Sequence, residues 1–187
     1  CVAISKPDKE IEELCHEMAK RYGLFVRKEI TSHLKYPSPT YYIHRGASGT
    51  NSLLNLLREI VGDGASLPKA YLCASREDRL RFLAGLLDSG GYYNTCYEIA
   101  QKHKRWCEDI MFLARSLGYF AQMKEKIVNG DSYWRVIISG DFSELPMRIP
   151  RKKAIPRRKK RQVSRSGFSV QPLGTGEYAG FTLDGDG

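Results

Sequence analysis

The residues of greatest chemical interest form one run, which reads Leu83, Ala84, Gly85, Leu86, Leu87, Asp88, Ser89, Gly90, Gly91. Asp88 is the one ionisable side chain in this run, and carboxylates are common ligands of divalent metal ions. No His or Cys cluster offers another metal site, since the five cysteines are odd in number and never spaced as Cys-x-x-Cys. The chemistry of this run therefore depends on what positions Asp88.

The flanking residues predict that the run is the second half of a helix. Ser75 is a good N-cap with an acid three residues later, and Gly90-Gly91 is a stop signal. Apolar residues recur at helical spacing between them: Phe82, Leu83, Leu86 and Leu87. Ala84 and Gly85 are small enough to let another helix approach closely. A buried helix with a glycine stop is the alternative interpretation.

This run resembles the LAGLIDADG motif that names a class of homing endonucleases, and Ser89 and Gly90 are among its mismatches. In that family, two such helices pack side by side, and each ends in an acid that holds Mg²⁺ over a scissile phosphate. The eighth position of the motif carries that acid, and here it is Gly90. Asp88 lies two residues earlier, about 200° around the helix, so it is expected to point to the other side. The resemblance thus implies an endonuclease ancestry without tight metal binding by this chain.

An internal repeat supports two half-sites. Residues 10–25 align with 105–120 at a shift of 95, which pairs Gly23 with Gly118 and Phe25 with Phe120. Val2–Ser5 falls on Tyr97–Ala100 at the same shift, and residues 42–46 align at a shift of 94 with a stretch ending at Gly140. Each copy reads strand, amphipathic helix, glycine stop, strand, turn, strand. We therefore predict helices near 8–21 and 105–117 in equivalent positions about a pseudo-dyad, each over a mixed or antiparallel sheet.

The same shift places a partner for the motif before residue 1. The chain is accordingly expected to be a fragment that lacks the first motif. Its 42% hydrophobic content is ordinary for a globular domain, and its cysteines are expected to be reduced and to pack in the core of an intracellular protein. The sequence contains no apolar run long enough to span a membrane.

Candidate DNA contacts come from strands of alternating polarity. Residues 92–99 alternate between two faces, and the alternation does not settle which face is open. Residues 120–128, the Asn129-Gly130 turn and residues 133–139 predict a hairpin that fits a major groove. Ordinary solvated surface is the alternative for each candidate. The candidates are Tyr93, Thr95, Tyr97, Gln101, Lys102, Lys104, Lys124, Lys126, Arg135, Arg157, Arg158, Lys159, Lys160 and Arg161.

The net charge of +9 resides in one segment. Residues 148–165 hold ten of the thirty Lys and Arg and no acid, which leaves 20 basic against 21 acidic residues elsewhere. Two prolines and the charge density predict an exposed segment without regular helix. It is interpreted as a linker, with a DNA-contacting arm or a nuclear localisation signal as alternatives.

The C-terminal residues carry a second resemblance. Residues 166–170 and 176–187 read as short strand-like runs, and Tyr178-Ala179-Gly180-Phe181-Thr182-Leu183 before an acidic glycine turn resembles a strand of the Hint splicing domain of inteins. The sequence of these residues is most similar to inteins of the fungal pre-mRNA-splicing scaffold factor. Glycine-rich hairpins of unrelated β-proteins are the alternative for so short a stretch.

Together these features predict an α+β protein with a pseudo-twofold LAGLIDADG fold, in which two αββαββα-type half-domains, the first incomplete, are followed by a short all-β Hint-like segment. The expected domains are residues 1–147 (endonuclease), 148–165 (basic linker) and 166–187 (start of the Hint segment). The resemblance implies an intein-embedded homing endonuclease, here degenerate, that would cut double-stranded DNA at the intein-free allele. A catalytically dead nucleic-acid-binding module and a purely structural insert are the alternatives.

The expected partners are double-stranded DNA, the flanking Hint segments and the host extein protein, with no membrane. The chain itself is expected to be a monomer with an internal pseudo-dyad, located in the nucleus with its host.

Overall fold

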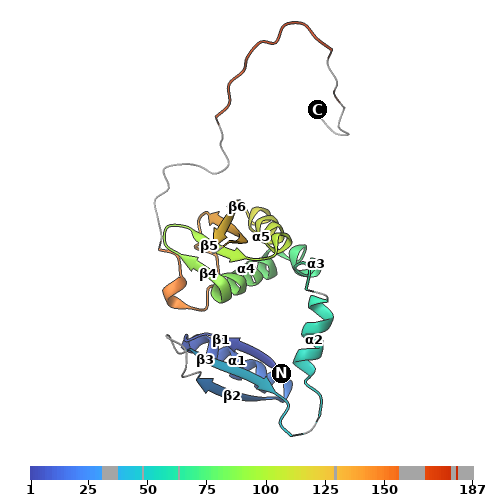
Figure 1. Cartoon of the computed structure of the whole chain (residues 1–187), viewed down its shortest axis with the longest axis vertical. Coiled ribbons are helices and arrows are strands. Elements are labelled where there is room, and N and C mark those ends of the chain that lie inside the picture. Colours follow the sequence, from blue (N-terminus) through green and yellow to red (C-terminus); the bar gives the residue numbers. More distant parts are fainter. Residues whose placement is uncertain are drawn as a thin grey trace.

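The computed structural model describes residues 1–30, 38–47, 49–62, 64–128, 130–155, 167–177 and 180. Its elements form two units, one above the other in Figure 1, which α2 joins along one side and η1 along the other. Unit 1 comprises residues 1–61 and unit 2 comprises residues 67–144. In chain order the elements are β1 (Val2–Ser5), α1 (Lys9–Tyr22), β2 (Phe25–Ile30), β3 (Pro39–His44), α2 (Ser52–Val61), α3 (Lys69–Leu72), α4 (Arg76–Gly90), β4 (Gly91–Tyr93), β5 (Tyr97–Gln101), α5 (Lys104–Ser116), β6 (Phe120–Val128), β7 (Asp131–Ser139) and η1 (Pro150–Lys152).

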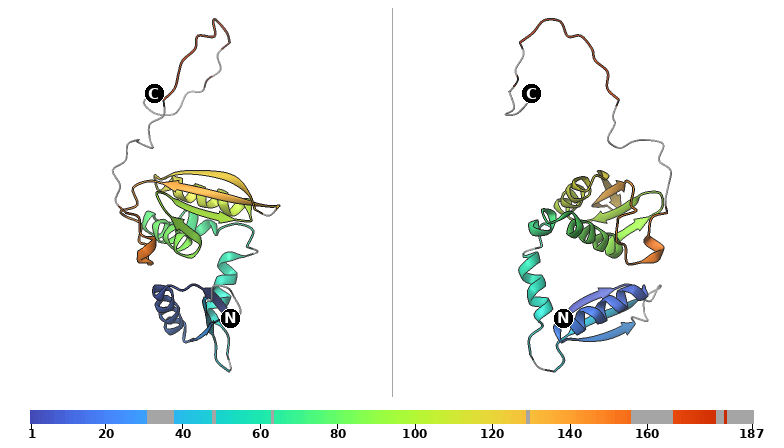
Figure 2. Two further views of the ribbon diagram at one scale, coloured as in Figure 1. Left: turned by 60° about the vertical axis from the view of Figure 1, so that its left-hand side comes forward. Right: turned by 180° about the vertical axis from the view of Figure 1, so that it is seen from behind.

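Each unit packs helices against one face of an antiparallel sheet. In unit 1 the strand order is β1-β3-β2 and α1 covers the sheet, as the view from behind in Figure 2 shows. In unit 2 the order is β4-β5-β7-β6, and both α4 and α5 contribute to the core. Unit 2 therefore contains elements that have no counterpart among the described residues of unit 1, and these include α4 and β4.

The two units repeat one topology, as the sequence predicts. Strands β1-β3-β2 correspond to β5-β7-β6, and the registers agree residue by residue. Val2 faces Ile43 in unit 1, and Tyr97 faces Ile138 in unit 2, each member 95 residues further along. The left-handed glycines that end the two helices, Gly23 and Gly118, obey the same shift, with φ of 62° and 87°. The predicted repeat is confirmed.

The register corrects one detail of the alignment. Residues 42–46 align by eye at a shift of 94, because that shift superimposes two glycines, Gly46 and Gly140. The strand pairing instead keeps a shift of 95 through the end of the sheet, since Phe25 faces His44 just as Phe120 faces Ser139. Strand pairing outweighs the glycine match because a one-residue slip would move every side chain of β3 to the opposite face.

The predicted hairpin is present as β6 and β7, which pair along their whole length from Phe120↔Ser139 to Val128↔Asp131. Gly130 has a φ of 85°, the left-handed conformation that a tight turn of this kind requires. Asn129, its predicted partner in the turn, lies outside the described residues.

The cores of the two units are separate clusters. The core of unit 2 includes buried residues of α4, α5, β5 and β7, such as Leu83, Leu87, Ile110 and Ile138. The core of unit 1 is smaller: α1 and β3 supply most of it, Leu53 of α2 joins it, and so does Ile149 from beyond unit 2. A unit with one covering helix thus recruits distant residues to bury its sheet.

The start of the basic segment departs from the predicted exposed linker. Ile149 and Lys152 are buried, and Pro150–Lys152 forms the short 3-10 helix η1. The expectation was based on charge density and proline content, but a long cationic side chain is buried when acceptors for its charge are available. Arg157, Arg158, Lys159, Lys160 and Arg161 lie outside the described residues.

The predicted Hint-like strands are absent from the described residues of the C-terminal segment. Residues 167–177 contain no strand, and Phe168, Val170 and Leu173 are exposed, in a stretch that extends away from both units in Figure 1. A strand needs a hydrogen-bonding partner, and residues 167–177 belong to neither sheet of the structure. Residues 178, 179 and 181–187 are outside the described residues.

The cysteines follow the expectation only in part. All five are free thiols. Cys15 and Cys107 are buried in the cores of units 1 and 2, whereas Cys1 and Cys73 are exposed, because they lie at the start of the chain and just before α4 rather than on a covered face. Within the described residues, no helix is both long and apolar enough to cross a membrane.

Candidate nucleic-acid interface and the end of the motif helix

The predicted motif helix forms as α4, with the capping predicted from its sequence. The Ser75 hydroxyl accepts the backbone N–H of Asp78 at 3.1 Å and donates to the Asp78 carboxylate at 2.7 Å. Leu80, Leu83, Ala84 and Leu87 are buried along one side of the helix. These contacts fix the helix over the sheet and so fix where residues 88–91 lie.

Asp88 points into the protein and not toward the surface. Its side chain is 5% exposed, and one carboxylate oxygen accepts the backbone N–H of Arg148 at 2.8 Å. The other oxygen accepts the backbone N–H of Ile149 at 3.2 Å. This is the side of the helix expected from its two-residue offset from position 90. Asp88 binds backbone amides and is therefore a structural residue in this arrangement.

Ser89, the next residue of the motif run, has a local structural role. It is exposed, and its hydroxyl donates to the Leu86 carbonyl, three residues earlier in α4, at 3.0 Å. Serine hydroxyls commonly bond to the preceding turn of their own helix in this way. Ser89 therefore bonds to the backbone of its own helix.

Gly90 lies at the exposed end of α4. A Cβ at this position would come within 3.4 Å of Ile99 Cδ1 and 3.8 Å of Gln101 Nε2, which are ordinary contact distances. The absence of an acid here is therefore not imposed by crowding. Gly91 differs, because a Cβ there would lie 2.7 Å from the Leu87 carbonyl oxygen. Glycine at 91 is required by packing, and glycine at 90 is not.

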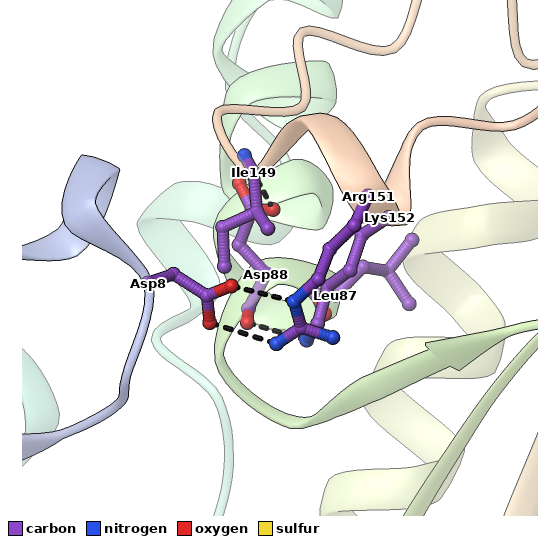
Figure 3. A network of polar contacts seen from close by, with 6 residues as sticks. All are labelled: Asp8, Leu87, Asp88, Ile149, Arg151 and Lys152. Carbon is purple, nitrogen blue, oxygen red and sulfur yellow. Dashed lines mark hydrogen bonds and ion pairs between the residues drawn. The ribbon is translucent and has the colours of Figure 1, made fainter. Parts of the chain in front are cut away.

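A buried lysine stabilises the same end of the helix. Lys152 is 6% exposed, and its ammonium donates to the carbonyls of Leu87 at 2.9 Å and Asp88 at 2.6 Å, as Figure 3 shows. Burial lowers the pKa of this ammonium. The last carbonyls of a helix have no partner within the helix and carry partial negative charge, so a cation here stabilises the terminus.

The residues present do not fit the metal site that the family resemblance implies. Gly90 has no donor atom, and both Asp88 oxygens already accept backbone amides. No group of three or more His, Cys, Asp or Glu gathers elsewhere in the described chain. The end of α4 therefore lacks the ligands that a metal-dependent step requires.

The structure shows which face of the unit 2 sheet is open. Tyr97, Ile99 and Val136 are buried under the helices, so the residues that alternate with them lie on the open face. Arg135 and Lys124 face each other there, and Lys126 faces Tyr133. Three of the candidate DNA contacts, Lys124, Lys126 and Arg135, are thus on one accessible surface.

Tyr97 is a correction to the candidate set. It is 1% exposed, its ring packs against Tyr93 and Phe142, and its hydroxyl donates to the Lys152 carbonyl at 2.6 Å. It is a core residue because the alternation of β5 turns it toward the helices, and it cannot contact DNA. Tyr93 lies on this same inner face and is partly buried against Tyr97.

The other candidates lie at the two ends of β5 and at the start of α5. Gln101 ends β5 on the inner face opposite Trp134, close to the position of Gly90. Lys104 begins α5 with its ammonium 4.7 Å from the centre of the Trp134 ring, a cation–π arrangement. Thr95 and Lys102 are exposed in the connections that flank β5. Gln101 thus borders the end of α4 and lies on the opposite face of the sheet from Lys124 and Lys126.

Sequence reasoning missed several accessible side chains of the open faces. Tyr92 is 65% exposed beside Glu98, and Gln122 faces Ile137 in the row next to Lys124. On the corresponding face of unit 1, the Arg27 guanidinium lies 5.2 Å from the centre of the Tyr42 ring. The repeat could have identified these open-face positions from the sequence, because the shift of 95 pairs Arg27 with Gln122.

Open-face charges are partly neutralised within the protein. Arg135 pairs with Glu98 at 3.2 Å, and Arg27 pairs with Glu29 at 3.0 Å. One nitrogen of Arg135, Nε, is buried without a hydrogen-bond partner. Lys124 and Lys126 are thus the clearest free cations of this face among those with described side chains.

Comparison with known proteins relates unit 2 to a known family and both units to a known fold. Residues 67–141 match the model of the homing endonuclease family. Among solved structures, the chain is similar to I-DmoI in complex with DNA and Mn, with a TM-score of 0.54 and 12% identity over 74% of this chain and 73% of that one. Mesophilic variants of the homing endonuclease I-DmoI match with a TM-score of 0.54 and 12% identity over 74% and 68% of the two chains. A further I-DmoI variant, in complex with its target DNA and Mg, matches with a TM-score of 0.54 and 13% identity over 74% of this chain and 72% of that one. The α+β architecture is thus that of the LAGLIDADG homing endonucleases, as predicted.

Proposed function

We propose that this chain is the DNA-binding part of an intein-embedded homing endonuclease domain that no longer cleaves both DNA strands. The end of α4 carries the proposal. The position of the family's acid is Gly90, which supplies no ligand, and the neighbouring carboxylate of Asp88 accepts two backbone amides. Mg²⁺ belongs to the ancestral reaction, and the residues of this chain do not fit it.

Binding of double-stranded DNA is supported by the two open sheet faces. A β-ribbon such as β6–β7 has the size to enter a major groove, where Arg, Lys and Gln side chains read base edges. Gln122, Lys124 and Lys126 follow one another on the open side of β6. Their spacing, every second residue, keeps all three on the same surface.

The intein context is supported by the sequence resemblance of the C-terminal residues. In this proposal the chain functions between the flanking Hint segments of a fungal-type intein and is released with them from the host extein protein. It would be monomeric, since its repeat supplies both half-sites, and it would reside in the nucleus with its host. The basic stretch 157–161 would contribute nonspecific contacts to phosphates.

The test is DNA retention and cleavage on one substrate, with and without magnesium. We expect salt-sensitive retention of duplex DNA that does not depend on Mg²⁺, and no linear product from a plasmid that carries the candidate intein-free allele. Metal-dependent linearisation would show instead that an active endonuclease survives. Loss of all retention in low salt would favour a purely structural insert in the splicing element.

A further inference from the structure

Residues Leu145–Lys152 run between the two units and contact both, and we call this segment the strap. Its buried apolar side chains are divided between the two units. Leu145 and Met147 are buried in the core of unit 2, whereas Ile149 is fully buried in the core of unit 1. A linker that merely leads away from a domain would not bury side chains in two separate cores.

Polar contacts attach the strap to unit 2 through the end of α4. Asp88 accepts the backbone amides of Arg148 and Ile149, and Lys152 donates to the last carbonyls of the helix. The Tyr97 hydroxyl adds a bond of 2.6 Å to the Lys152 carbonyl. These contacts involve buried or partly buried groups, so breaking them would leave polar groups without partners and would cost free energy.

The contacts with unit 1 are of a different kind. Arg151 forms a bidentate pair with Asp8 just before α1, at 2.6 and 2.8 Å, and Figure 3 shows the two side chains meeting across the gap between the units. The hydrogen bond from Arg151 lowers the pKa of the Asp8 carboxyl. Arg148 pairs with Glu17 at 3.1 Å. Apart from the single apolar side chain of Ile149, the strap therefore holds unit 1 by ion pairs of partly exposed arginines.

The strap provides the main side-chain attachment between the units. Within the residues that the structure describes, the two cores share no member, and the ion pairs that link unit 1 to the rest of the chain are those of Arg148 and Arg151. The other link along the described chain is α2, which buries Leu53 in unit 1 and ends before the connection to α3. The position of one open sheet face relative to the other thus depends on the strap.

We propose that the strap is a releasable clasp, fixed to unit 2 and detachable from unit 1, that sets the relative position of the two open sheet faces. Release would pull Ile149 out of the core of unit 1 and separate Arg151 from Asp8, while unit 2 keeps its own core and its contacts with the strap. This proposal adds a conformational control to the proposed DNA-binding function and rests on that function only where DNA is used as a readout.

Two buried cysteines provide the measurement within one molecule. Cys15 is fully buried in the unit 1 cluster that contains Ile149, and Cys107 is fully buried in the core of unit 2. In the full-length chain, Asp8→Asn and Arg151→Gln are each expected to raise the rate of Cys15 alkylation roughly threefold to tenfold, with Cys107 unchanged. Modification is followed by mass spectrometry of the peptide that contains each cysteine.

The matched control is Arg81→Gln, which removes an exposed ion pair with Glu77 on α4, at 2.6 Å, that does not involve the strap. The rate of Cys15 alkylation in this control should equal that of the parent. The charge-swapped protein, Asp8→Arg with Arg151→Asp, should recover much of the lost protection, because the pair is restored with opposite polarity. Ile149→Ala should give the largest increase, and the ion-pair variants still test the proposal if that protein does not fold.

Two results of the alkylation experiment would overturn the proposal. Equal acceleration of both cysteines would mean that the ion pair supports the fold as a whole, and unchanged Cys15 rates in all variants would mean that unit 1 is not held by the strap. Neither measurement contains DNA, so this outcome is independent of the proposed function. A fall in affinity of Arg151→Gln for a duplex of random sequence, with Cys15 unchanged, would also contradict the clasp, since it would assign Arg151 to direct DNA contact.

Discussion

The two glycines that end α4 have different physical roles. Gly90 has room for a side chain, whereas a Cβ on Gly91 would overlap the backbone of Leu87 at 2.7 Å. Gly90→Ala is therefore expected to leave the free energy of unfolding unchanged or to raise it by about 0.5 kcal/mol, because alanine restricts the unfolded chain more. Gly91→Ala is expected to lower it by about 2 kcal/mol through overpacking.

Urea unfolding of the two variants against the parent checks this difference. Similar losses in both would contradict the distinction between a glycine retained by packing and one that merely occupies the acid position. The distinction matters for the proposed function because it makes Gly90 a position where an acid can be introduced.

Tyr97 is expected to give the protein an alkaline sensitivity. Burial raises the pKa of its hydroxyl to about 12, whereas an exposed tyrosine ionises near pH 10. Because the folded pKa is the higher one, the stability linked to this group is complete below about pH 10 and is lost as pH rises through about 12. Tyr97→Phe should therefore show a shallower loss of stability between about pH 10 and pH 12.

The free energy of unfolding of Tyr97→Phe should also be about 1 kcal/mol lower at neutral pH, because the hydrogen bond to the Lys152 carbonyl is lost. Denaturant unfolding at several pH values measures both effects. Tyr92→Phe, at an exposed position, is the control. Because burial also raises the pKa of Tyr119, some alkaline sensitivity is expected to remain in Tyr97→Phe, but an identical pH profile would contradict the assignment.

At the level of single residues, the sequence predicts capping and direction but not burial. The Ser75 cap follows from local rules, and so does the direction of Asp88, because helix geometry determines both. Tyr97 could not be separated from Tyr92 in the same way. A strand that alternates tyrosines on both faces looks the same from either side until the helices that cover it are placed.

At the level of elements, the open side of the β6–β7 ribbon is the surface to test for DNA contact. Lys124→Ala with Lys126→Ala should weaken duplex binding for all sequences. It should also lower the slope of log affinity against log salt by up to about 1.8, since each lost phosphate contact removes about 0.9. Titrations of a fluorescent duplex at several salt concentrations measure this slope.

The control for this pair is Lys20→Ala with Arg21→Ala. Both residues are exposed on α1, the helix that covers the opposite side of a sheet from its open face. The control should keep the salt slope of the parent. If the two double variants weaken binding equally, the interaction is a general attraction to a basic protein and the ribbon has no special part in it.

The repeat and the strap show which elements can be predicted and why. Helices α1 and α5 and the β6–β7 hairpin are local patterns of apolar residues and turns, and the sequence predicts each of them. The strap is a tertiary contact. Nothing in the run of Arg, Lys and Pro at 148–153 indicates that Ile149 will fill the core of a unit that precedes it by more than 80 residues.

At the level of the whole molecule, the repeat explains the dependence of unit 1 on distant residues. Unit 2 covers its sheet with α4 and α5, and unit 1 has α1 in the place of α5 without a described counterpart of α4. A sheet face left open on its inner side exposes apolar surface, so Leu53 and Ile149 gain stability by covering it. The two units are thus equivalent in topology but unequal in how they are completed.

That inequality determines what catalysis can be expected of the whole chain. Cutting both strands of a duplex in this family needs one acid per half-site, as the resemblance implies, and metal-assisted hydrolysis needs a ligand at each. Unit 2 has Gly90 at that position, and Gly90 supplies no ligand atom. We expect no linear product from a supercoiled plasmid carrying the candidate intein-free allele, with either Mg²⁺ or Mn²⁺.

Gly90→Asp supplies a single acid beside Gln101 and should at most convert supercoiled plasmid to the nicked form. Gel electrophoresis distinguishes the three plasmid forms, and Gly90→Asn, which has a similar shape but no charge, is the control for the acid. Linear product from the unmodified chain would contradict the assignment of Gly90 to the acid position, and nicking by Gly90→Asn equal to that by Gly90→Asp would show that the carboxylate is not the group responsible.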